Sequence, residues 1–193
     1  MLTLYHFWSS TCSRRVRICL AEKAIEWQSH HIDITKKMEN LEPWYLALNP
    51  NGVVPALEHD GNVVIESNVI IQYLDDAFAG ASLTPEDPLK RAKMREMLDK
   101  FEHVVHANIN LISYNRRHVP RVSHLSEGAQ RDLILRIGNP DRRQRMLERL
   151  AAGVSAEAEV RAEARLADIL DEMEVMLEGR DWLLGAFSLA DIS

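Results

Sequence analysis

The sequence predicts an α/β domain followed by an all-α helical-bundle domain. Residues 1–82 alternate short apolar, β-branched runs with segments of helical spacing, whereas residues 89–193 carry helical spacing alone. The segment 83–88 between them contains two prolines and is interpreted as a linker. A chain of 193 residues is long enough for two small domains of this kind.

The N-terminal domain is expected to contain four strands and three helices. Asp60-Gly61 separates two of the strands and is a strong signal for a tight hairpin. Ser13 is the expected cap of the first helix. The expected order is β-α-β-α-β-β-α, which is that of a thioredoxin fold, with strands at 2–7, 27–34, 54–58 and 63–65 and helices at 13–23, 36–48 and 67–78.

The C-terminal domain is expected to consist of helices alone. Its strongest pattern is the amphipathic stretch 156–177, which Gly179 ends. Gly138-Asn139-Pro140 separates two shorter helices. Ser188 and Asp191 have the spacing of a capping box, which starts a helix close to the end of the sequence. The other expected helices are 89–112, 132–137 and 142–150.

Composition and charge argue against several classes of function. A net charge of −6 gives no electrostatic case for binding nucleic acid or an anionic membrane. No apolar run reaches 18 residues, and no signal-peptide pattern precedes the first strand. The two cysteines, Cys12 and Cys19, lie about 10 Å apart along one predicted helix, too far for a disulfide. Free thiols indicate a reducing, cytoplasmic compartment, and the lack of a Cys-x-x-Cys spacing argues against a dithiol oxidoreductase.

The run Val53-Val54-Pro55-Ala56-Leu57 is apolar and reads as a strand, yet proline cannot donate to a β-ladder. A cis Val54–Pro55 peptide is therefore expected, with the main-chain groups of Val54 free to pair with an extended peptide. Glu66-Ser67 follows eleven residues after Pro55 and begins a helix. A carboxylate, a hydroxyl and free N–H groups at that point can hold the ammonium and carboxylate of an amino acid.

A second polar segment, Ser9-Ser10-Thr11-Cys12-Ser13, lies between the first strand and the first helix. Unpaired N–H groups and the positive end of the helix dipole favour ionised thiols there. A bound thiol, or Cys12 itself, would therefore ionise more readily. The simpler interpretation is that these hydroxyls only cap the helix.

These two polar segments together resemble the glutathione site of cytosolic glutathione transferases. The run from Ser10 to Cys12 is similar to the Ser-x-Cys segment of zeta-class members, which include maleylacetoacetate isomerase. It also resembles the bacterial tetrachlorohydroquinone dehalogenases of the same family. Zeta members usually show Ser-Ser-Cys, whereas Thr11 stands in the middle here.

The resemblance assigns a role to each matching residue. Ser10 would hydrogen-bond the glutathione thiolate, and Cys12 would act on the sulfur side of the site. Val54, which precedes Pro55, would pair its main chain with the cysteinyl part of glutathione. The γ-glutamyl end would be held by Glu66 and Ser67. Members of the family often hold the glycine carboxylate with a His, Lys or Gln about fifteen residues before the proline, and Asn40 occupies that position here, with Lys36 and Lys37 nearby.

The predicted function is that of a glutathione transferase, which activates the glutathione thiol for attack on a small electrophile. Glutathione would be the co-substrate, and the protein would be a cytoplasmic homodimer. No metal, nucleic acid or membrane is expected as a partner. One alternative is a glutathione-dependent isomerase or reductive dehalogenase that uses Cys12. Another is a non-catalytic scaffold with the same fold. Family members continue for several helices beyond the Ser188–Asp191 motif, so further helices are expected after Ser193.

Other candidate residues are given structural or surface roles. Tyr5, in the first strand, is expected to pack rather than to act in catalysis. His103 and His106 have i, i+3 spacing, but no third metal ligand is apparent. Arg142-Arg143 is expected on a solvated face. For Arg116-Arg117-His118 the alternative of binding an acidic or phenolic second substrate remains open.

Overall fold

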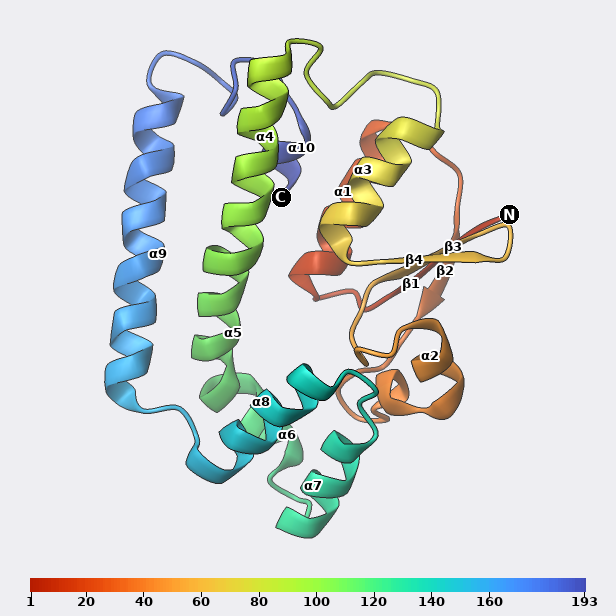
Figure 1. Ribbon diagram of the computed structural model, residues 1–193, viewed down its shortest axis with the longest axis vertical. Helices are drawn as coiled ribbons and strands as arrows, with labels where there is room; N and C mark the ends of the chain where they lie inside the picture. Colours follow the sequence, from red (N-terminus) through yellow and green to blue (C-terminus); the bar gives the residue numbers. More distant parts are fainter.

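The N-terminal region of the molecule is built on one mixed sheet of four strands (Figure 1). The computed structural model describes residues 1–193. The strands β1 (Leu2–His6), β2 (Gln28–His31), β3 (Ala56–His59) and β4 (Asn62–Ile65) lie in the order β2-β1-β3-β4. β1 is parallel to β2 and antiparallel to β3, which pairs antiparallel with β4. Asp60 and Gly61 connect β3 to β4 with φ of 48° and 81°, which confirms the predicted tight hairpin.

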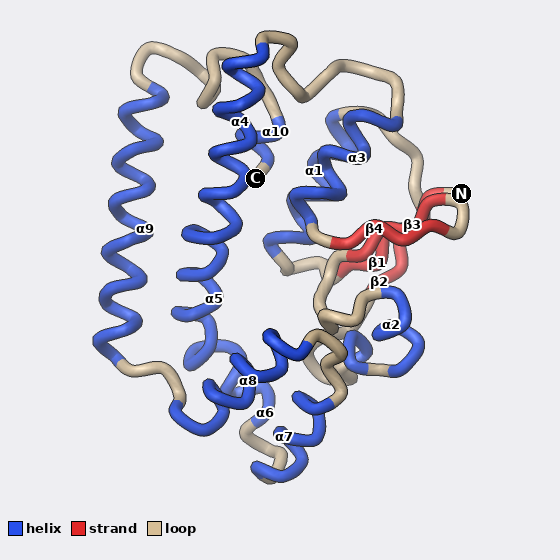
Figure 2. The backbone as a smooth tube through the Cα atoms, viewed as in Figure 1, coloured by secondary structure: helices blue, strands red, loops and turns tan.

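Helices cover both faces of this sheet (Figures 1 and 2). α1 (Thr11–Glu22) and α3 (Ser67–Ala77) pack side by side on one face, and α2 (Pro43–Leu48) lies on the other. The element order confirms the predicted thioredoxin-like α/β fold. Fully buried residues of the two helices, among them Leu20 and Ile71, form a core with Leu4 and Leu57 of the sheet.

Two of the predicted helices in the N-terminal domain begin elsewhere than expected. α1 begins at Thr11 rather than Ser13, because the Ser10 hydroxyl accepts a hydrogen bond from the Ser13 N–H at 3.2 Å and caps the helix. The predicted helix 36–48 is wrong for its first half. Met38 has a left-handed φ of 53° and Pro43 lacks an N–H, so a short 3₁₀ turn (Glu39–Leu41) precedes α2. The second strand is also shorter than predicted and ends at His31.

The rest of the chain is helical, as predicted. α4 (Pro88–Lys100) leads through a π-helical turn (Phe101–His106) into α5 (Ala107–Ser113), and a second π-helical turn (Tyr114–His118) leads into α6 (Val119–Val122). Then follow α7 (Glu127–Leu135), α8 (Pro140–Ala152) and α9 (Ala156–Leu177), the last with the predicted bounds. The predicted helix 132–137 begins earlier, at Glu127, where Ser126 caps it. Ser188 and Asp191 form the predicted capping box at the start of α10 (Leu189–Ile192).

The two halves of the chain share one core. The cluster that contains Leu20 and Leu74 also contains Met94 and Leu98 of α4 and Leu189 of α10. α1 and α3 therefore lie between the sheet and the long helices, as Figure 1 shows. We keep the division into residues 1–82, 83–88 and 89–193 as a proposal about domain architecture, and the shared core implies that residues 1–82 do not fold independently.

A buried ion pair ties the linker to this core. Lys23, just after α1, lies 2.8 Å from Asp75 of α3, and both side chains are almost fully buried. Asp75 also accepts a hydrogen bond from the N–H of Leu83, and Lys23 donates to the carbonyl of Ala81. The pair thus fixes where the chain leaves the α/β half and enters the helical half.

Candidate active site

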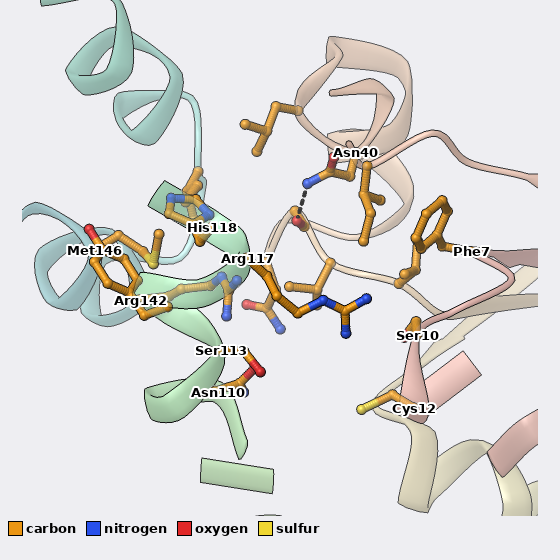
Figure 3. Close-up of a pocket in the computed structure, with 18 of the residues that line it drawn as sticks. Phe7, Ser10, Cys12, Asn40, Asn110, Ser113, Arg117, His118, Arg142 and Met146 are labelled. Carbon is orange, nitrogen blue, oxygen red and sulfur yellow. Dashed lines mark hydrogen bonds between the residues drawn. The ribbon is translucent and has the colours of Figure 1, made fainter. Parts of the chain in front are cut away.

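A cleft of about 630 Å³ lies between the two halves of the chain. Its volume is in the range of small-molecule binding sites. One wall is formed by the starts of α1 and α3 and by the loop before β3, and the other by residues from the end of α4 to α8. Figure 3 looks into this cleft, with Ser10 and Cys12 on one side and Arg117, His118 and Arg142 on the other. All the residues predicted to form the site line it, as do Ser9 and Thr11.

The start of α1 presents unsatisfied donors to the cleft. The side-chain oxygen of Ser10 accepts the N–H of Ser13, so the hydroxyl proton of Ser10 remains free to donate. The N–H groups of Thr11 and Cys12 have no acceptor in the protein, since they belong to the first turn of the helix. Together with the helix dipole, these donors favour a negatively charged atom beside Ser10.

The loop before β3 offers a free main-chain edge. The Val54–Pro55 peptide is cis, as predicted. The carbonyl of Val53 accepts from the hydroxyl of Tyr45 at 2.7 Å and from the amide of Asn49 at 2.8 Å, and these bonds fix the loop. Neither the N–H nor the carbonyl of Val54 is hydrogen-bonded within the protein. An extended peptide can therefore pair with Val54.

The start of α3 forms the next part of the same wall. The hydroxyl of Ser67 accepts from Arg15 at 2.8 Å, which leaves its own proton free, and the N–H groups of Ser67 and Asn68 have no acceptor in the protein. Arg15 also donates to Asn68 and Glu102, so it anchors the start of α3 to the helical half. Glu66, at φ 68°, accepts a hydrogen bond from Asn51.

Asn40 also reaches the cleft, but one of its donors is already used. Its side-chain amide donates to the carbonyl of Gly52 at 2.7 Å, the bond drawn in Figure 3. The other N–H is the only donor left for a ligand, because the amide oxygen is an acceptor. Lys36 and Lys37 do not line this cleft, and Lys37 pairs instead with Glu39 at 3.5 Å.

Cys12 meets a residue that the sequence did not identify as its partner. Its sulfur lies 3.6 Å from Nδ1 and 3.7 Å from Nε2 of His106, in the π-helical turn after α4. Burial alone would raise the pKa of Cys12, but the hydrogen bond and charge of His106, with the charge of Arg15, outweigh it and leave the pKa below its ordinary value. The same hydrogen bond raises the pKa of His106 against the opposing effect of burial. The pair therefore favours a thiolate beside an imidazolium.

Several other candidates lie outside this chemistry. Cys19 is fully buried and burial raises its pKa to about 12, so it stays a thiol. The hydroxyl of Tyr5 donates to Glu58 at 2.8 Å, away from the cleft, which agrees with a packing role. His103 faces Asp99 at 3.3 Å rather than the cleft. No group of three His, Cys, Asp or Glu side chains is placed to hold a metal ion.

The arginine clusters divide between surface and cleft. Arg116 pairs with Glu163 at 2.7 Å on the surface, whereas its neighbour Arg117 lines the cleft. Arg143 donates to the carbonyl of Ile137, whereas Arg142 lines the cleft. The expectation that Arg142-Arg143 forms a solvated face is therefore wrong for Arg142. Helical spacing alone could not identify which arginine of each pair faces inward.

The loop between α7 and α8 touches the α/β side of the cleft directly. The N–H groups of Gly138 and Asn139 donate to the carbonyl of Pro50, and the side chain of Asn139 donates to Asn51 at 2.9 Å. A Cβ on Gly138 would lie 3.2 Å from atoms of Pro50, so only glycine allows this approach without displacement. The cleft is thus closed at this end by contacts between the two halves.

Comparison with known proteins identifies the family. Residues 9–77 match the family model described as "Glutathione S-transferase, N-terminal domain". The tetrachloro-p-hydroquinone reductive dehalogenase of Sphingobium chlorophenolicum is 30% identical over 99% of this chain and 79% of its own length. The chain belongs to the glutathione transferase family.

Solved structures of this family share the fold over nearly the whole length of this chain. The β-etherase LigF from Sphingobium sp. strain SYK-6 superimposes with a TM-score of 0.89 at 31% identity, covering 99% of this chain and 79% of that one. A glutathione transferase homologue from Sulfitobacter, solved with bound glutathione, has a TM-score of 0.67 at 26% identity, covering 100% and 78%.

The sequence matches to other relatives are shorter. Protein LigF is 46% identical over 49% of this transferase-family chain, and the maleylacetoacetate isomerase of Pseudomonas aeruginosa is 44% identical over 49%. These matches span 37% and 45% of the two relatives. The family and fold are therefore established, and the specific activity is a matter for proposal.

Proposed function

We propose that this protein is a glutathione transferase that binds glutathione along the α/β wall of the cleft. The observation that carries the proposal is that three segments with unpaired hydrogen-bonding groups line the same wall. These are the start of α1 at Ser10, the free main chain of Val54 and the start of α3 at Ser67. A thiol, a peptide main chain and an α-carboxylate follow in that order along glutathione, so each element has a matching partner.

Each contact follows from ordinary hydrogen-bond chemistry. Val54 pairs with the N–H and carbonyl of the cysteinyl residue. The α-carboxylate of the γ-glutamyl residue accepts from the free hydroxyl proton of Ser67 and the N–H groups at the start of α3. Glu66 attracts the α-ammonium group. Asn40 has one N–H left for the glycine carboxylate, and this is the weakest contact of the set.

Activation of the thiol is assigned to Ser10 and the start of α1. The hydroxyl of Ser10 donates to the glutathione sulfur, and the helix dipole stabilises its negative charge, so the thiol loses its proton more readily. The thiolate attacks an electrophilic carbon of the second substrate. A carbon–sulfur bond forms, the leaving group departs with the electron pair of its bond, and the thiol proton passes to solvent.

The contact between Cys12 and His106 favours a second candidate, a glutathione-dependent isomerase or reductive dehalogenase. In the reductive case, the thiolate of Cys12 attacks the sulfur of a glutathione thioether. A sulfur–sulfur bond forms, the carbon–sulfur bond breaks, and the carbon keeps the electron pair and takes a proton from the imidazolium of His106. A second glutathione thiolate then reduces the mixed disulfide and leaves as glutathione disulfide.

We also propose that the protein acts in the cytoplasm as a homodimer, which is the expectation for this family. No helix in the structure is long and apolar enough to cross a membrane. Light scattering on the purified chain tests the dimer, since a mass near 22.1 kDa, that of one chain, would contradict it.

Retention on glutathione-agarose and a chromogenic conjugation assay test the main proposal. With 1-chloro-2,4-dinitrobenzene as electrophile, Ser10→Ala should lower kcat by about 10²–10³-fold, as loss of one oxyanion-hole donor does. In a conjugating enzyme, Cys12→Ser should leave the rate nearly unchanged. In the second candidate, Cys12→Ser abolishes reductive turnover. Retention without turnover on any electrophile would instead indicate a scaffold.

A further inference from the structure

The helical wall of the cleft is strongly cationic. Five arginines line it, whereas the carboxylates that line the cleft are those of Glu66 and Glu102. Glu102 is already paired with Arg15, 3.2 Å away. The five are Arg117, Arg121, Arg142, Arg145 and Arg149.

These guanidinium groups have no anionic partner in the protein. None of the five takes part in an ion pair, and none donates a side-chain hydrogen bond to another residue. The Nε of Arg142 is buried with no hydrogen-bond partner at all. Buried donors in proteins are normally satisfied, so an unsatisfied guanidinium facing a cleft points to a ligand that supplies the acceptor.

The local electrostatics agree with this geometry. Burial lowers the pKa of Arg142, and the charges of Arg145 and Arg149 lower it further. Burial followed by the charges of Arg121, Arg142 and Arg149 also lowers the pKa of His118. The charge of Glu66 opposes the shift of Arg142 but does not outweigh burial and the neighbouring arginines. A bound anion would add to that opposing effect.

Apolar side chains lie between these charges. Tyr114, Ile134 and Met146 line the same wall, and the Arg149 guanidinium lies 5.9 Å from the centre of the Tyr114 ring. Figure 3 shows Arg117 and Arg142 extending from the helical half into the cleft, with Arg117 directed towards the side that carries Ser10. A ligand that fits this wall has a flat or apolar body and a negative group.

We propose that this arginine wall is a subsite for a carboxylate or phenolate carried by the electrophilic second substrate. The proposal rests on the proposed glutathione site, because glutathione must occupy the opposite wall and present its sulfur to the electrophile. Guanidinium groups bind planar anions through paired hydrogen bonds, which fixes orientation as well as affinity. The second substrate is therefore an electrophile with an apolar body and a negatively charged group, rather than a neutral electrophile.

Calorimetry with S-substituted glutathiones tests this without requiring turnover. The parent probe is S-benzylglutathione, and the test probes are its 3-carboxybenzyl and 4-carboxybenzyl derivatives. At low ionic strength, at least one derivative should bind the wild-type protein about tenfold or more tightly than the parent, as expected for a charged hydrogen bond. Added salt should reduce this preference.

Neighbouring arginines provide matched controls. Arg117→Met and Arg142→Met should each reduce the preference several-fold and leave affinity for the parent nearly unchanged. Arg116→Met and Arg143→Met remove an arginine that faces away from the cleft, so both should keep the preference. Circular dichroism verifies that each variant is folded, and the wild-type comparison stands even if a variant is not.

Three results would overturn the proposal. Equal binding of the parent and both carboxylated probes would show that the wall does not select anions. A further probe is S-benzylglutathione with its glycine carboxylate converted to an amide. If this amide loses the same factor in affinity that Arg117→Met causes for the parent probe, the arginines hold the glycine carboxylate and not the electrophile. Failure of folded wild-type protein to bind even S-benzylglutathione would sink the proposed glutathione site itself, and this proposal with it.

Discussion

The sulfur of Cys12 lies 3.6 Å from Nδ1 of His106, although 94 positions separate the two residues in the sequence. Cys12 stands in the first turn of α1, and His106 ends the π-helical turn that follows α4. The contact joins the α/β half to the helical half, and both residues line the cleft. It gives the cysteine a proton acceptor, which neither the helix start nor the nearby arginines supply.

Replacing His106 should raise the pKa of Cys12. The folded-state pKa of Cys12 is lowered, so its thiolate persists below an ordinary thiol pKa of about 8.5. In His106→Asn the alkylation rate of Cys12 by iodoacetamide should therefore reach half its maximum at a higher pH than in wild type.

His103→Asn is the matched control, because that side chain is 74% exposed and faces Asp99. It should leave the alkylation profile unchanged. Cys12→Ser should remove fast labelling altogether, since Cys19 is buried with a pKa raised to about 12. Identical profiles for wild type and His106→Asn would contradict the pairing.

Removing the hydroxyl of Ser67 should weaken glutathione binding. Ser67→Ala loses one hydrogen bond to a charged group, worth about 1.5–3 kcal/mol or roughly 10–150-fold in affinity. Titration calorimetry measures the change. Ser155→Ala, which removes a comparable hydroxyl at the start of α9, should keep wild-type affinity. Unchanged affinity in Ser67→Ala would remove Ser67 from the site.

The buried pair of Lys23 and Asp75 should make stability sensitive to acid. Burial opposes ionisation of Asp75, but the hydrogen bonds from Lys23 and Leu83 outweigh it, so its folded-state pKa lies below the ordinary value. The contribution of Asp75 is therefore present above its unfolded pKa of about 3.9 and lost as the pH falls through the folded value.

Asp75→Asn should lower the free energy of unfolding at neutral pH by about 3–5 kcal/mol, because Lys23 is left buried without its partner. Urea denaturation measures this loss. The neighbouring Asp76 is exposed and makes no ion pair, so Asp76→Asn should stay within about 0.5 kcal/mol of wild type. Equal losses of unfolding free energy in both variants would show that the ion pair of Lys23 and Asp75 does not account for the effect.

Residues 1–82 alone should fail to unfold cooperatively. Leu74 of α3 and Leu98 of α4 belong to one core, so removing the helical half exposes apolar surface that α1 and α3 normally bury. Differential scanning calorimetry of the fragment should show no sharp transition. A cooperative transition near that of the full chain would instead support residues 1–82 as an independent folding unit.

Most of the fold could be predicted from the sequence because the local signals for turns, caps and helices are strong. Asp60-Gly61, the linker prolines and the Ser188–Asp191 capping box each depend on neighbours in sequence, and the structure has the turn, the connection and the cap where they were predicted. The helix predicted at 36–48 failed because periodicity does not report the left-handed φ of Met38.

The site could be predicted only in part for the same reason. Val54 and Glu66-Ser67 were found through a fixed local spacing, whereas His106 faces Cys12 through tertiary packing that no spacing reveals. The i, i+3 spacing of His103 and His106 suits metal ligands, but no third ligand accompanies it, and the spacing does not indicate that His106 faces Cys12. Likewise, Arg142 and Arg143 are adjacent, and only the packing of α8 turns one of them into the cleft.

A crystal structure with glutathione tests the central claim most directly. We expect the glutathione main chain to pair with Val54, its γ-glutamyl carboxylate to lie at the start of α3 beside Ser67, and its sulfur to lie within hydrogen-bond distance of the Ser10 hydroxyl. Density for glutathione elsewhere in the cleft, or a sulfur atom that points away from both Ser10 and Cys12, would contradict the account.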